Sequence, residues 1–122
     1  MAYLGVSVSL QAENNLQATI FVIQLVEHFV SEQGRWPSSW SELEEAPFDD
    51  DLHGQGWPAA SPPVQRRVQI DFQVDPREVA QQDPMSFTAI QPIGPYYEYR
   101  HYGYVKSLQT TVRKSINNVT SQ

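Results

Sequence analysis

The stretch that decides the fold runs from Asn14 to Trp40 and reads NNLQATIFVIQLVEHFVSEQGRWPSSW. Apolar residues recur in it at spacings of three and four, which predicts an amphipathic helix with one broad face in the core. This face consists of Leu16, Ile20, Ile23, Val26 and Val30, widened by Val22, Leu25 and Phe29. Asn14 is a suitable N-cap, with Gln17 at the third helical position, and Gly34 supplies the left-handed residue that ends the helix. We therefore expect a spine of about 30 Å, the width of a small domain.

The composition of the whole chain is that of one small globular domain. It has 122 residues, 40% of them hydrophobic and 18% charged, which is enough to bury one core. The net charge of −6 disfavours nucleic acid and anionic lipid as partners, because no basic field recruits phosphates. The absence of cysteine excludes disulfides and thiolate metal sites. We predict a single domain over residues 1–122, with a loose surface loop at about 48–63.

The segment before the spine has two interpretations. Leu4, Val6, Val8 and Leu10 alternate with small residues, which is typical of a half-buried strand. The alternative is that the spine helix continues backwards through this segment. We predict the strand. The segment has no basic region or clear cleavage site of a signal peptide, and no stretch of the chain reaches the ~18 apolar residues of a membrane span. It is also compatible with the tail of a removed membrane anchor.

Capping patterns predict two short helices after the spine. Ser39 and Glu42 form a capping box, and the helix that follows places Leu43 inward and ends before Pro47. The run Asp75-Pro76-Arg77-Glu78 combines a cap, a proline at the first helical position and a glutamate at the third, which predicts a second helix start.

The remaining patterns predict an antiparallel sheet and a closing helix. We expect three strands, at Val68–Val74, Met85–Ile90 and Tyr96–Tyr102, the first because its apolar residues alternate. Apolar spacings of three and four predict a helix over Val105–Asn118. The fold class is thus α+β, with a long N-terminal spine helix packed on a small antiparallel sheet and a closing C-terminal helix.

The densest aromatic run of the chain is the candidate interaction surface. It comprises Tyr96, Tyr97, Tyr99, Arg100, Tyr102 and Tyr104. Tyrosine and arginine dominate protein–protein hot spots, so we expect these residues to contact a protein partner or a second copy of the chain. The alternative is purely structural, because aromatic residues are also good strand formers.

The three tryptophans lie close to prolines and are a candidate ligand pocket. They are Trp36, Trp40 and Trp57. Ligand sites are typically lined by apolar and aromatic side chains. The alternative is that these rings pin the long loop to the helix layer.

Metal and enzyme chemistry have weaker candidates. His28 and Glu32 are four residues apart on the spine, but no third ligand is near in sequence. The run Asp49–Asp51 with His53 does not match the spacing of a calcium loop. Because nucleophile, phosphate-binding and dinucleotide motifs are also missing, we predict no catalytic residue, no metal and no cofactor. The alternative is a small metal- or ligand-binding domain, or an enzyme, that uses His28, His53 or His101 with nearby carboxylates.

The residues around the end of the spine also carry a family resemblance. Glu27–Ser39 reads EHFVSEQGRWPSS, follows a helix rich in Ile, Val and Leu, and precedes a short helix around Leu43. Over residues 14–45 this arrangement resembles the soluble domains of type IV pilin-like proteins and type II secretion pseudopilins. In those families a spine helix often ends in a glycine, an aromatic and a proline, and a small antiparallel sheet packs on the spine. The resemblance implies a non-enzymatic assembly or scaffold protein of the cell envelope, with membrane contact through an anchor beyond the given residues; without it, we expect a cytoplasmic interaction domain.

Overall fold

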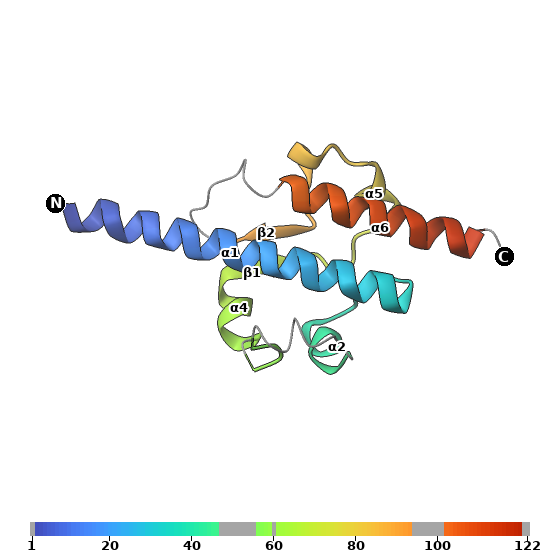
Figure 1. Cartoon of the computed structure of the whole chain (residues 1–122), viewed down its shortest axis with the longest axis horizontal. Helices are drawn as coiled ribbons and strands as arrows, with labels where there is room; N and C mark the ends of the chain where they lie inside the picture. Colours follow the sequence, from blue (N-terminus) through green and yellow to red (C-terminus); the bar gives the residue numbers. More distant parts are fainter. Residues whose placement is uncertain (1, 47–55, 60, 94–101, 121–122) are drawn as a thin grey trace.

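One helix, α1 (Ala2–Gln33), runs along the molecule and supplies much of its core (Figure 1). This computed structural model describes residues 2–46, 56–59, 61–93 and 102–120, without the side chains of 2–13, 102 and 118–120. Leu16, Ile23 and Val26 have no exposed surface, as their spacing predicts. Gly34 then adopts a φ of 73°, and its N–H donates to the Val30 carbonyl over 2.8 Å. The predicted glycine stop is therefore confirmed.

The N-terminal part of α1 differs from our prediction. The helix begins at Ala2, so the strand predicted over residues 4–10 is wrong, and Asn14 lies inside the helix and does not cap it. The alternative of a helix that continues backwards is correct. No proline interrupts the segment, and extending an existing helix avoids the cost of nucleating a new element. The 32 residues make a helix of about 48 Å, and its N-terminal part extends beyond the elements that cover the rest (Figure 1).

Two short helices, α2 (Trp40–Glu45) and α4 (Ser61–Arg67), pack on one side of α1 (Figure 1). Ser39 caps α2 and Leu43 is fully buried, as predicted. The predicted loop ends earlier than expected, because α4 already begins at Ser61. Of the rest of that loop, residues 48–55 and 60 lie outside the described part of the chain.

The sheet is smaller than predicted. In the described residues it consists of β1 (Val68–Ile70) and β2 (Ile90–Pro92), paired antiparallel with Val68 opposite Pro92. The strand predicted over Val68–Val74 is right for its first three residues and too long beyond them. Asp71 ends it, because its Oδ1 accepts the N–H of Gln73 over 3.0 Å and turns the chain away from the ladder.

The second predicted strand, Met85–Ile90, is wrong except at its last residue. Pro84–Ser86 form a short 3-10 helix, η1. Asp83 caps it by accepting the Met85 N–H over 2.9 Å, and the Met85 side chain is exposed. Of the third predicted strand, residues 96–101 lie outside the described part of the chain, while Tyr102 begins a helix.

The closing helix, α6 (Tyr102–Thr120), lies beside the C-terminal half of α1 and runs in the same direction (Figure 1). Val105, Leu108 and Val112 are buried along it, which confirms the predicted apolar face. A polar contact joins the same two helices, because Glu27 of α1 accepts the hydroxyl of Ser107 over 2.7 Å. The α+β class, with a spine helix, a small antiparallel sheet and a closing helix, is thus confirmed.

Between the two strands, the helix α5 (Pro76–Gln81) packs on α6. Asp75 caps it as predicted, because its Oδ1 accepts the N–H of Arg77 over 2.9 Å. Gln109 of α6 is 1% exposed and donates through Nε2 to the carbonyls of Val79 and Gln82, over 2.9 and 2.6 Å. These two bonds from a buried side chain fix α5 in place against α6.

Candidate functional site

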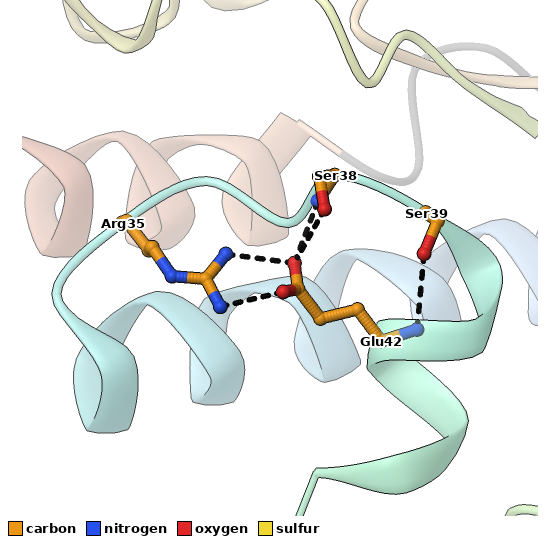
Figure 2. Close-up of polar contacts among 4 residues, drawn as sticks. All are labelled: Arg35, Ser38, Ser39 and Glu42. Carbon is orange, nitrogen blue, oxygen red and sulfur yellow. Dashed lines mark hydrogen bonds and ion pairs between the residues drawn. The ribbon is translucent and has the colours of Figure 1, made fainter.

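The turn that leaves α1 is closed by an ion pair between Arg35 and Glu42 (Figure 2). The two terminal nitrogens of the guanidinium donate to the two carboxylate oxygens over 2.7 and 2.5 Å, which is the bidentate geometry of the strongest pairs. Oε1 of Glu42 also accepts the backbone N–H of Ser38 over 2.8 Å. The guanidinium lies over the ring of Phe29, 5.2 Å from its centroid. We call this arrangement the Arg35–Glu42 clasp.

The clasp changes the predicted capping box and the acidity of Glu42. Ser39 accepts the Glu42 N–H over 3.1 Å as expected, whereas the Glu42 carboxylate reaches one residue further back, to Ser38. The hydrogen bond from Arg35 and the one from the Ser38 backbone lower the pKa of Glu42 to about 2. The hydrogen bond to Glu42 raises the pKa of Arg35. Both groups are therefore charged at neutral pH, where the ion pair holds the turn.

A cavity of about 440 Å³ opens beside this turn, between the end of α1, the start of α5 and the second half of α6. Its apolar lining comes from Val30, Trp36, Val112 and Ile116, of which the first three are buried. The Trp36 Nε1–H donates to the Asp71 carbonyl over 2.9 Å, so the ring is held in one orientation. The result is a preformed apolar concavity of the size that ligand sites have.

Two cationic side chains lie in the lining of the cavity. Arg35 and Arg77 line it, and a second cavity of about 290 Å³ continues past Arg77 to Arg113. The Arg77 side chain is 77% exposed, and its Nε lies 3.7 Å from Asp75 Oδ1. The Arg113 Nε donates to the Ala80 carbonyl over 3.0 Å, which holds this guanidinium at the junction of α5 and α6. In a chain of net charge −6, this is a locally basic rim around an apolar floor.

The three predicted tryptophans do not share this cavity. Trp36 lines it, whereas Trp40 packs edge-on against Phe72, with ring centroids 5.9 Å apart. Trp57 is 2% exposed, and its Nε1–H donates to the Leu43 carbonyl of α2 over 3.1 Å. Trp57 therefore fastens the turn before α4 to α2, as the alternative interpretation of these rings describes.

The tyrosine surface stays a prediction. Tyr96, Tyr97, Tyr99 and Arg100 lie outside the described residues, and the structure does not describe the Tyr102 side chain. Tyr104 lies in the first turn of α6 with 38% of its surface exposed.

The histidines give no assembled site within the described part of the chain. His28 is half-buried on α1 and Glu32 is exposed one turn later. Asp49–Asp51, His53 and His101 lie outside the described residues. Among the residues that are described, no three His, Asp or Glu side chains gather in a way that could hold a metal ion. None of the described helices combines the length and apolar character that a membrane crossing needs.

Comparisons with known proteins provide no information on the function of this chain. No protein-family model, no curated protein and no solved structure matches this chain.

Sequence reasoning missed the arginine-rimmed cavity. Its lining comes from three stretches, around Trp36, Arg77 and Val112, and no local sequence pattern predicts that these stretches lie close together. One signal was present: Arg77 and Arg113 are two of only eight basic residues, and each belongs to a helix whose existence the sequence predicts.

Proposed function

We propose that this chain is a non-enzymatic assembly or scaffold domain of the pilin-like kind, which contacts protein partners or further copies of itself. The observation that carries the proposal is the length of α1. Its 32 residues exceed what the body of the domain covers, and the N-terminal part extends away from it (Figure 1). We call residues 2–12 the stem.

The stem has the composition of a surface that another protein buries. It reads AYLGVSVSLQA and contains no charged residue before Glu13. Large uncharged apolar surfaces on soluble domains mark interaction sites, because their exposure to water is unfavourable. An extended helix of this kind is suited to side-by-side packing with a second helix.

The end of the spine gives further support. Gly34 has the left-handed conformation of a helix stop, and Trp36 and Pro37 follow it into the buried layer. Leu43 is fully buried in the next short helix, and the sheet of β1 and β2 contacts α1. The resemblance to pilin-like domains rests on these features, and they support the proposal.

Cross-linking tests this proposal, since the chain has no cysteine and any introduced thiol is unique. We expect Val8→Cys, in the stem, to form disulfide-linked dimers under mild oxidation, or disulfide adducts with a partner that itself carries a cysteine. Gln24→Cys is the matched control. Gln24 is exposed, and it lies in the part of the same helix on which the other elements of the domain pack. Equal, slow cross-linking of both variants, at the rate of random collision, would contradict the proposal.

A further inference from the structure

The rim of the cavity at the end of α1 has a consequence for which partner this domain accepts. We propose that this arginine-rimmed cavity binds an acidic, apolar segment of a protein partner, with apolar side chains on the Trp36 floor and flanking carboxylates on Arg77 and Arg113. The inference rests on the proposed function in one respect, namely that the partner is a protein. It concerns a surface at the opposite end of α1 from the stem (Figure 1).

The floor of the cavity selects an apolar group. Trp36 and Val112 are 7% and 1% exposed, and both still line a space of about 440 Å³. The hydrogen bond from Trp36 to Asp71 and the packing of Val112 in the core fix the floor before any partner arrives. A preformed floor lowers the entropic cost of binding, because its side chains are already ordered. Apolar anchors in such pockets contribute most of the binding free energy of an interface.

The rim selects negative charge. Arg35, Arg77 and Arg113 are three of the eight basic residues of a chain that has 14 acidic ones. The two adjoining cavities have a single acidic residue in their lining, Asp75, whose Oδ1 caps α5 and also lies 3.7 Å from the Arg77 Nε. Arg35 is held by Glu42 in a bidentate pair, and Arg77 has a longer, exposed contact of 3.7 Å with Asp75. The charge offered to a partner is therefore that of Arg113, together with the exposed guanidinium of Arg77, whose contact with Asp75 a carboxylate of the partner can replace.

A carboxylate matches the donor geometry of these two arginines. A guanidinium presents a planar fork of donors that pairs with a carboxylate through two parallel bonds. A basic partner would be repelled at this rim, and nucleic acid would be repelled by the chain as a whole because of its net charge of −6. The partner chemistry that matches both floor and rim is a short segment in which acidic residues flank apolar ones.

Titration of the full chain with the capped peptide acetyl-Asp-Leu-Leu-Glu-amide tests the inference. The three indole N–H signals in a nitrogen–proton correlation spectrum serve as reporters, since Trp36 lines the cavity while Trp40 and Trp57 do not. We expect a saturable shift of the Trp36 signal and little change in the other two. A Trp36 signal that does not move up to solubility-limited peptide, or that moves no more than the others, would overturn the inference.

Three further arms make the test specific. Arg77→Gln should weaken binding about two- to fivefold, as loss of one exposed ion pair implies. It should leave α5 intact, because Asp75 accepts the Arg77 backbone N–H. Arg66→Gln on α4 is the control, since Arg66 is also exposed and lines neither cavity. The peptide acetyl-Asn-Leu-Leu-Gln-amide should bind more weakly, by at least the same factor.

The outcomes separate the two proposals. Equal losses of peptide affinity for Arg66→Gln and Arg77→Gln would mean general electrostatic attraction and would overturn the inference. Tighter binding of hexanoate than of the acidic peptide at Trp36 would indicate a small-molecule site and would also overturn it. If Arg77→Gln disturbs the fold, Arg113→Gln takes its place with the same expectation. Peptide binding at Trp36 without cross-linking through the stem would remove the assembly function and leave this site; the reverse result would remove the site alone.

Discussion

At the scale of single residues, the clearest device is the Arg35–Glu42 clasp. It ties the residue after the helix stop to the first turn of α2, so the turn between the two helices has one geometry (Figure 2). Trp36 lies inside that turn and lines the cavity, so the clasp also fixes the cavity wall. The role of Glu42 as a helix residue was predictable from its spacing to Ser39, but its partner Arg35 was not, because a capping box directs the carboxylate to the cap residue itself.

The clasp predicts how stability depends on pH. The folded pKa of Glu42 is about 2, below the ordinary value of 4.5, so the unfolded chain binds the proton more readily. The stabilisation is therefore fully present above pH 4.5 and is lost as the pH falls towards 2. We expect Glu42→Gln to lower the free energy of unfolding by about 0.5–1 kcal/mol at pH 7. The difference from the parent should shrink to near zero at pH 2 in urea titrations. A difference that stays constant over this range would exclude the clasp as its source.

Gly34 makes a second prediction at this scale. Its φ of 73° is costly for any other residue, and we expect Gly34→Ala to destabilise the fold by about 1–2 kcal/mol. The cost comes from the backbone alone, because an added Cβ would lie 3.9 Å from the Ser115 Oγ, an ordinary contact. Gly103→Ala is the control with the opposite sign. It lies in α6 with open space around it and should stabilise by about 0.5–1 kcal/mol. Thermal melts that shift in the same direction for both variants would refute this account of the turn.

At the scale of elements, the covered half of α1 is the core of the domain. Ile23 has no exposed surface, and the neighbouring Gln24 is exposed. We expect Ile23→Ala to destabilise by about 2–5 kcal/mol, the usual range for truncation of a buried aliphatic side chain. Gln24→Ala should change stability by less than about 0.5 kcal/mol. Guanidinium unfolding of the two variants checks this face, and similar midpoints for both would mean that α1 is rotated about its axis relative to this structure.

The short elements show where sequence patterns decide and where they do not. The Asp75-Pro76 pair correctly predicts the start of α5, whereas a second such pair, Asp83-Pro84, begins η1 where we predicted a strand. The apolar alternation that continues through Val74 predicts a long strand, but Asp71 turns the chain after three residues. In each case a local side-chain hydrogen bond overrides a weak period-two pattern.

At the scale of the whole molecule, long-range packing settles what local patterns leave open. The apolar stripes of α1 and α6 specify two helices but not that they lie side by side and parallel, with α5 on α6 (Figure 1). The cavity is formed by residues that are far apart in the sequence and that this arrangement brings together, which is why it was not predicted. Conversely, the period-two pattern in the stem predicts a strand, but the stem is helical because extending α1 avoids the cost of nucleating a new element.

Sedimentation velocity of the parent chain and Val6→Lys tests the central claim, that α1 continues as a helix beyond the domain to present a contact surface. Among the described side chains of α1, the first buried ones are Asn15 and Leu16, and the stem extends beyond the other elements (Figure 1). We therefore expect a charge at residue 6 to leave the melting temperature unchanged. We predict that the parent associates as its concentration rises, and that Val6→Lys with the same melting temperature stays monomeric. Identical sedimentation of the two chains across that concentration range, or a large fall in the melting temperature of Val6→Lys, would contradict the account.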